Sequence, residues 1–458
     1  MGRKRVDLTE GPILPQLLRF AFPILMGTIV SQLYNVADSV IVGRFVSSDA
    51  LAAVSAGAPI MNLIMLFFVG MSSGSSVVVA QRVGTKNREA LQKTVGTVAV
   101  MTLAVSAFLT VFGLLVCRPT LAALGTPENI LEDTTRYLAV IFLSTTGNMV
   151  YQMGSGVLQG MGDSTWPFLF LTGCSVLNVI LDLIAVLVLH MGVLGVAIAT
   201  GISQLVSAIG VVFRLNRGNY NISLTPKSIR PDKEEAKKIL SIGLPAAIQN
   251  VGNTIAALFV QSSVNYFGAG FIAANSIVTK VDDLINIPIM AFSTALCTFV
   301  AQNMGVGNLN RIRKGTNQCI ASLTGLGIVL FALLLSFRGQ FPKLFSTDAE
   351  IIHYASEGLA IMSFMCLFFA VDRCLVNTMR GVGKAVVPMI TAQFGAFSRI
   401  PLAYFLGVQM NDYHGIFYAL LIAAFLRMAA IAAYFYCGGW ARAVRKMETA
   451  SRSQETSE

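Results

Sequence analysis

The sequence predicts an all-α polytopic membrane protein with twelve transmembrane helices, arranged as two parallel six-helix repeats. Three observations support this: the composition, twelve long apolar runs, and the recurrence of one half of the chain in the other. Hydrophobic residues make up 55% of the 458 residues and charged residues only 12%, against about 25% in soluble domains. The mean hydropathy of +0.69 and the 40 glycines are typical of packed membrane helices.

A helix of about 20 residues crosses about 30 Å of hydrocarbon, and twelve apolar runs are long enough. They cover roughly 17–42, 52–80, 94–117, 136–158, 166–189, 193–213, 239–265, 271–301, 315–337, 357–379, 386–408 and 415–437. The first run lacks a small-residue cleavage site and contains Asp38, so we expect a retained span rather than a signal peptide.

The loop charges orient these spans. Most of the 33 basic residues fall in loops on one side if the amino terminus is cytoplasmic, as the positive-inside rule requires. We therefore expect a multi-pass protein of the plasma membrane with both termini in the cytoplasm. The net charge of +10 lies in short loops between apolar runs, so nucleic-acid binding is not expected.

The same pattern divides the chain into domains. We predict a first lobe over 1–218, a cytoplasmic linker over 219–238, a second lobe over 239–440 and a cytoplasmic tail over 441–458. The seven cysteines are scattered without C-x-x-C spacing, which indicates packing thiols rather than a metal site.

An internal repeat relates the two lobes. A shift of 221 residues places Val79-Ala80-Gln81 on Val300-Ala301-Gln302, and Gly160 and Gly162 on Gly381 and Gly383. Because each half has six spans, both repeats have the same orientation and are related by an axis along the membrane normal. Such bundles flank a central pathway, and rocking of one against the other gives alternating access.

Two acids in the first half lie within spans and have no basic partner there, namely Asp38 and Asp182. A charge near the centre of a membrane helix costs about 2.5–3.5 kcal/mol on insertion scales, so each needs compensation. Asn178 lies four residues before Asp182 on the same helix face, and Thr200 lies at a similar depth in the next span. These four residues predict a site for a hard cation such as Na⁺, which prefers oxygen ligands.

Two other interpretations of this site remain open. Two close carboxyl groups in an apolar setting could carry a proton instead of a metal cation. Alternatively, each acid simply bonds to a neighbouring helix. Pro23, fifteen residues before Asp38, can kink or hinge the first span because proline removes a helical hydrogen bond. It is a candidate gating residue, with an ordinary packing kink as the alternative.

The second half differs at the matching positions, because Asn178 corresponds to Arg399 and Asp182 to Ala403. We expect Lys280 with Asp283, and Asp372 with a nearby arginine, to form internal ion pairs. Substrate contact is the alternative, and Asp372, near the middle of its span, is its best candidate.

Several motifs resemble those of the multidrug and toxic compound extrusion (MATE) transporters. They are Asp38-Ser-Val-Ile-Val-Gly43 after Pro23, Ala52-Ala-Val-Ser55, Ala80-Gln-Arg-x-Gly84, Leu158-Gln-Gly-Met-Gly162 and Arg399-Ile-Pro401. The resemblance covers nearly the whole chain. It implies twelve spans in two six-helix lobes that form a V, and a first-lobe ion site at Asp38, Asn178, Asp182 and Thr200. It also implies that the first-span proline, Pro23 here, bends in some members.

The resemblance implies a function as well. Family members export organic cations and amphipathic drugs in exchange for Na⁺ or H⁺, so we expect a small organic, cationic substrate, no cofactor, a lipid environment and a monomer. The NorM-like branch has an acid in its seventh span, where this chain has polar residues including Gln249 and Asn253. The chain therefore leans toward the DinF-like branch. Gln249, Asn253, Asp283 and Asp372 are candidate substrate contacts.

Two further functional classes are alternatives to an exporter of cations. A flippase or exporter for an anionic or lipid-linked substrate would use the basic residues of the second lobe, Lys280, Arg373, Arg399 and Arg427. An enzyme is not expected, because no span contains histidine and no set of nucleophile, base or metal ligands can be assembled at one depth.

Overall fold

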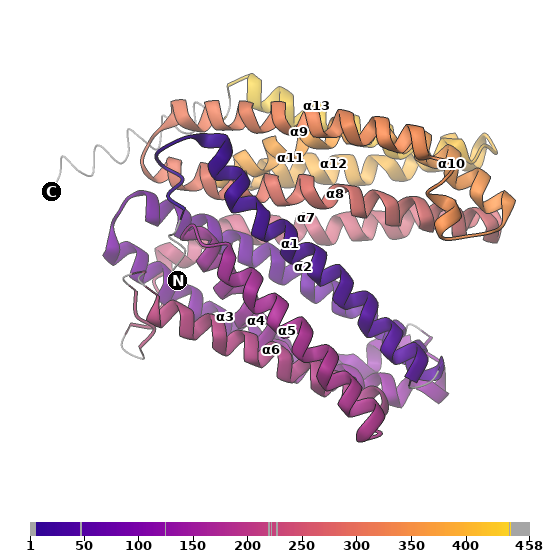
Figure 1. The fold of residues 1–458 in the computed structure, drawn as a ribbon, viewed down its shortest axis with the longest axis horizontal. Coiled ribbons are helices and arrows are strands. Elements are labelled where there is room, and N and C mark those ends of the chain that lie inside the picture. The colour runs from indigo at the N-terminus through magenta and orange to yellow at the C-terminus, as the bar shows by residue number, and fades with distance from the viewer. Residues whose placement is uncertain are drawn as a thin grey trace. The chain divides into compact units, whose positions relative to one another are not determined.

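The computed structural model describes residues 6–45, 48–123, 125–218, 220, 222–225, 228–438 and 440. Every labelled element is a helix (Figure 1). The first half contains α1 (Ile13–Phe45), α2 (Ser48–Gly84), α3 (Arg88–Ala123), α4 (Glu128–Gly160), α5 (Thr165–Leu183), η1 (Ile184–Val188) and α6 (Gly192–Arg217). The second contains α7 (Lys233–Asn265), α8 (Gly268–Gly305), α9 (Leu309–Phe337), η2 (Pro342–Leu344), α10 (Ala349–Ser363), α11 (Met365–Gly381), α12 (Val386–Ala403), η3 (Tyr404–Gln409) and α13 (His414–Tyr436).

The prediction of an all-helical membrane protein is confirmed. By length and composition, nine described helices could cross a membrane, or ten if the bent pair α10 and α11 counts as one span. Each of the twelve predicted runs falls, within a residue, on one helix or on two consecutive helical segments. The predicted single span 357–379 is instead bent by 46° where α10 meets α11.

The structure repeats its backbone details at the offset seen in the sequence. A Cβ added to Gly160 would lie 2.6 Å from the carbonyl oxygen of Ser76, and one added to Gly381 would lie 2.7 Å from that of Cys297. Both members of each contact are thus displaced by the same offset. Positive φ angles recur at His190 and Asn411 as well. The close contacts at Gly160 and Gly381 need glycine, because any side chain there would meet backbone atoms.

The chain separates into two compact units. Unit 1 contains Arg19–Ala247, and unit 2 contains Leu8–Leu18 and the chain from Ile248 onward. The division therefore runs through α1 and α7, and both helices carry a proline close to it, Pro23 and Pro245 respectively. The first residues of α1 therefore pack with unit 2, and the first residues of α7 pack with unit 1.

In unit 1, α4 packs against α2, α3 and α6, and α5 packs against α6. Glycines allow close contact: a Cβ on Gly113 would meet the ring of Phe142, and one on Gly70 would meet the backbone of Ala247. Small residues at helix contacts are the usual means of packing in membranes, where lipid supplies no hydrophobic drive between helices.

Unit 2 has an aromatic and aliphatic core around the buried Phe271, which packs against Tyr354, Tyr413 and Phe417. The segment Leu8–Leu18 is held by hydrogen bonds to side chains of α8 and α9. Asn303 Nδ2 donates to the carbonyl of Leu8 at 3.0 Å, and the Arg311 guanidinium donates to carbonyls in the same segment.

Candidate functional site

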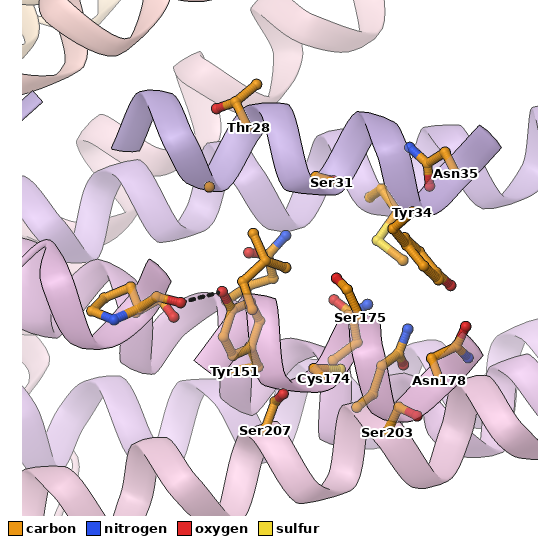
Figure 2. Close-up of a pocket in the computed structure, with 18 of the residues that line it drawn as sticks. Thr28, Ser31, Tyr34, Asn35, Tyr151, Cys174, Ser175, Asn178, Ser203 and Ser207 are labelled. Atoms are coloured by element: carbon orange, nitrogen blue, oxygen red, sulfur yellow. Dashed lines mark hydrogen bonds between the residues drawn. The ribbon is translucent and has the colours of Figure 1, made fainter. Parts of the chain in front are cut away.

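A cavity of about 690 Å³ lies within unit 1, a volume that suits a drug-sized guest. Its lining comes from α1, α2, α4, α5 and α6, and on α1 it runs from Pro23 to Asp38. At 1.5 Å per residue that is about 22 Å of helix. Figure 2 shows Tyr34 pointing from α1 toward the helices that carry Asn178 and Ser203.

The two unpaired acids predicted from the sequence lie together, and one of them, Asp38, lines this cavity. The carboxyl groups of Asp38 on α1 and Asp182 on α5 lie within hydrogen-bonding range of each other. One oxygen of each is buried and has no hydrogen-bond donor among the described residues, and Asp182 is fully buried. Two carboxylates this close repel each other, so the arrangement calls for a shared proton or a cation between them.

Asn178 and Thr200 complete this group. Asn178 lies one turn before Asp182 and is 2% exposed. With its amide turned to satisfy both neighbours, its nitrogen donates to Asp182 Oδ2 at 2.8 Å and its oxygen accepts from the Thr200 N–H at 3.2 Å. The structure therefore brings together all four residues that the sequence nominated as an ion site.

Two tyrosines near this site were missed in the sequence. The Tyr34 hydroxyl lies within hydrogen-bonding range of the Thr200 hydroxyl, and both Tyr34 and Tyr137 interact electrostatically with Asp38 and Asp182. Tyr34 stands four residues before Asp38, the spacing that places two side chains on one helix face. That spacing was a usable signal for Tyr34, whereas Tyr137 had none.

The rest of the lining is rich in hydrogen-bond acceptors. Hydroxyl groups of Thr28, Tyr151, Ser164 and Ser207 donate to backbone carbonyls at 2.8 to 3.3 Å. Each hydroxyl oxygen still has lone pairs to offer after its single hydrogen is used. The amide oxygen of Asn148 is buried without a donor in the described part of the chain. None of the described lining residues is Lys, Arg or His.

Pro23 lies at the other end of the same cavity wall. It is inside α1, so the carbonyl of Arg19 loses its usual helical donor. Arg19 is also the residue where α1 enters unit 1. The Ser164 hydroxyl bonds the next carbonyl, that of Phe20, at 2.8 Å. The proline thus coincides with a change in the packing of the helix.

In unit 2, the expected pairing of Asp372 with an arginine is present. Arg427 donates Nε to Asp372 Oδ1 at 3.0 Å and Nη2 to Oδ2 at 2.6 Å. Asp372 is 2% exposed, and both of its oxygens are used by this pair. It therefore has little left to offer a substrate unless the pair breaks.

The other expected pair is absent. Among the described residues, Lys280 and Asp283 form no ion pair, although they are three apart on α8. Both side chains are exposed, and the Lys280 ammonium lies 5.9 Å from the ring centre of Phe345 instead. An exposed pair would contribute little, so nothing forces the two side chains together.

The two residues nominated on α7 both contact arginines, Gln249 through its side chain and Asn253 through its backbone. Gln249 is 1% exposed and accepts a hydrogen bond from Arg380. The backbone carbonyl of Asn253 accepts from Arg399 Nη2 at 2.9 Å. Ala403, which replaces Asp182 in the repeat, is fully buried and precedes the π-helical turn η3, as Asp182 lies just before η1. The scaffold is repeated without the acid.

Comparison with known proteins agrees with this architecture. The sequence model of the MatE family matches residues 23–184 and 245–405, more than half of the chain. The two matched segments correspond to the two repeats.

Two curated relatives span most of the chain. The probable multidrug resistance protein YoeA of Bacillus subtilis is 29% identical over 397 residues, covering 84% of this chain and 85% of YoeA. A protein named FAD transporter from Shewanella oneidensis is 24% identical over 364 residues, covering 79% of this chain and 80% of its own length.

The fold matches solved structures too. A crystal structure described as MATE in the bent conformation superposes with a TM-score of 0.90 over 98% of this chain and 100% of its own, at 22% sequence identity. At that identity the similarity establishes the fold.

Proposed function

The chain belongs to the MatE family, and from this premise we propose that it is a secondary antiporter that exports organic cations and amphipathic drugs in exchange for Na⁺ or H⁺. The pair of Asp38 and Asp182, of which Asp38 lines a drug-sized cavity, is the observation that carries the proposal. The relative YoeA bears the name of a multidrug resistance protein, which supports export of drugs here.

The coupling ion binds at Asp38, Asn178, Asp182 and Thr200. Oxygens of two carboxyl groups, an amide and a hydroxyl suit a hard cation such as Na⁺, and the two acids alone suit a proton. Entry of one charge down 100 mV supplies roughly 2.3 kcal/mol. Binding of the ion neutralises the acids, which removes the reason for a cationic guest to stay in the cavity. The guest then leaves on the outer side.

The substrate charge follows from the lining. A cavity lined by an acid, Asp38, and by several hydroxyl lone pairs, with no basic lining residue among those described, favours a cation over an anion. Pro23 acts as the gate, because α1 can bend where the Arg19 carbonyl lacks its helical donor. Both termini are cytoplasmic, which the distribution of basic loop residues supports. The first-unit acids and the lack of an acid on α7 within the membrane favour the DinF-like branch.

Gradient-driven transport in proteoliposomes tests the proposal. When a Na⁺ or proton gradient is imposed, the purified protein should move a cationic dye such as ethidium in the direction opposite to the ion flow. Asp38→Asn should abolish this movement while the protein still binds the dye. The control is Asp133→Asn, which removes the charge of an exposed acid in the same unit and should transport normally. Gradient-driven transport at the normal rate by Asp38→Asn would refute the proposal.

A second candidate is the export of an anionic or lipid-linked substrate. The arginines of unit 2 favour it, and the Shewanella relative is named for FAD, whose diphosphate is anionic. Competition separates the two: organic cations should slow transport of the physiological substrate in the first case and leave it unchanged in the second.

A further inference from the structure

Four arginines from three helices gather in unit 2. Arg373 and Arg380 lie on α11, Arg399 on α12 and Arg427 on α13, and Arg427 is within electrostatic range of the other three. Gly395 allows this gathering, because a Cβ there would lie 2.6 Å from the Cβ of Arg427. The cluster is therefore built by close helix packing.

One of the four charges is fully compensated. Arg427 makes two hydrogen bonds to Asp372, and both side chains are buried. A fork-to-fork pair of this kind uses both carboxylate oxygens. Both oxygens of Asp372 are thus used by Arg427, and the carboxylate interacts with Arg373 and Arg380 only electrostatically, without a hydrogen bond among the described residues.

Two further arginines contact only neutral oxygens. Arg380 donates to the Gln249 side chain. Arg399 donates to the backbone carbonyls of Ala396 at 3.1 Å and Asn253 at 2.9 Å. These oxygens hold the guanidinium groups in place but carry no negative charge, and neither arginine forms an ion pair among the described residues.

Arg373 is the least satisfied of the four. Its guanidinium lies 5.6 Å from the ring centre of Phe369 and makes no side-chain hydrogen bond among the described residues. Its Nε, like that of Arg380, is buried without an acceptor there. Asp282 is within electrostatic range of Arg373, but the two form no ion pair in the described part of the chain. Buried guanidinium N–H groups without acceptors call for a ligand that supplies them.

We infer that Arg373, with Arg380 and Arg399, binds an oxyanion, a carboxylate or phosphate carried by the transported solute. A planar guanidinium fork matches the two oxygens of such a group. The inference rests on the proposed export function, since it names a chemical group of the substrate. Amphipathic solutes that carry an acidic group, including zwitterions, are then substrates alongside simple cations.

Equilibrium binding tests this site without any gradient. The probe is carboxyfluorescein, with a cationic rhodamine ester of the same ring system for comparison, added to the full chain in phosphatidylcholine nanodiscs. Arg373→Gln should weaken carboxyfluorescein binding about tenfold or more, as expected for loss of a charge-assisted hydrogen bond. The carboxyfluorescein affinity of Arg373→Lys should fall between those of the wild type and Arg373→Gln, because lysine keeps the charge but lacks the planar guanidinium fork.

Controls separate the site from general charge effects. Lys314→Gln removes an exposed positive charge in the same unit and should leave the affinities for carboxyfluorescein and for the rhodamine ester unchanged. Arg373→Gln should likewise leave the affinity for the rhodamine ester unchanged. Inorganic phosphate should compete with carboxyfluorescein in the wild type. Equal carboxyfluorescein affinity in Arg373→Gln and Lys314→Gln would overturn the inference.

A lipid headgroup is the other source of this chemistry. If phosphatidylglycerol in the nanodisc displaces carboxyfluorescein while inorganic phosphate does not, the site holds lipid and the assignment to the solute falls. Failure of the antiport proposal looks different: it would appear as absent gradient-driven transport with normal dye binding.

Discussion

Asp372→Asn should destabilise unit 2 severely. The substitution keeps the shape of the side chain but leaves the Arg427 charge without a counter-charge, next to three other arginines. It also replaces one of the two oxygens that accept hydrogen bonds from Arg427, at 3.0 Å and 2.6 Å, by the NH₂ group of an amide. Breaking one side of a buried pair costs about 3–5 kcal/mol, which for a unit of about 200 residues lowers the melting temperature by roughly 10 °C.

The buried cysteines of unit 2 provide the assay. Cys297, Cys319, Cys366 and Cys374 are all free and buried, so a dye that fluoresces on reaction with thiols reports their exposure as the unit unfolds. The midpoint for Asp372→Asn should fall well below that of the wild type in the same detergent. Cys374 lies two residues from the substituted position, so its reaction reports local as well as global opening.

A double substitution sharpens this test. Replacing Asp372 by Leu and Arg427 by Met removes both charges, and a well-packed apolar pair is often as stable as the ion pair it replaces. The double variant should therefore recover most of the lost midpoint. A midpoint for Asp372→Asn within one or two degrees of wild type, or a double variant as unstable as the single one, would refute the reasoning.

Three other predictions concern unit 1 and the repeat. Gly160→Leu and Gly381→Leu should each lower the free energy of unfolding by at least about 1–3 kcal/mol. The two losses should be similar, because both added side chains meet a backbone carbonyl at nearly the same distance. Unequal midpoints in thermal unfolding would contradict the structural repeat. Glu235→Gln should lower the stability of unit 1 by about 2 kcal/mol, since this 6% exposed acid accepts charge-assisted hydrogen bonds, and a wild-type unfolding curve would count against it. Tyr34→Phe should slow gradient-driven dye transport about fivefold without changing dye affinity, because only the hydroxyl beside Thr200 is lost; unchanged coupling would remove Tyr34 from the ion site.

The fold could be predicted because membrane helices leave a strong pattern in sequence. Backbone groups in lipid must be satisfied within the helix, so apolar runs and helices coincide closely. The offset of 221 residues between the repeats also appears in the structure, where Gly160 and Gly381 make equivalent contacts. The bend between α10 and α11 was missed, because no proline or glycine marks Phe364.

The candidate site was predictable in part for a similar reason. A lone acid in an apolar span is rare, so Asp38 and Asp182 stood out, and helix spacing added Asn178. Tyr34 was overlooked although it lies four residues before Asp38, and nothing in the sequence distinguishes Tyr137 from the ordinary tyrosines of membrane proteins. The pairing of Lys280 with Asp283 was wrong, since spacing along a helix permits an exposed pair without requiring it.

The hydroxyl-rich wall of the cavity in unit 1 has a consequence for selectivity. Ser203 keeps a hydroxyl group with no partner among the described residues, and a hydroxyl can rotate to give or receive a hydrogen bond. Guests of different shape and polarity can thus be matched by turning O–H bonds, with the backbone left in place. The cavity can then accept varied guests with little rearrangement. Replacement of a single serine should narrow the range of guests more than it lowers the affinity for any one of them.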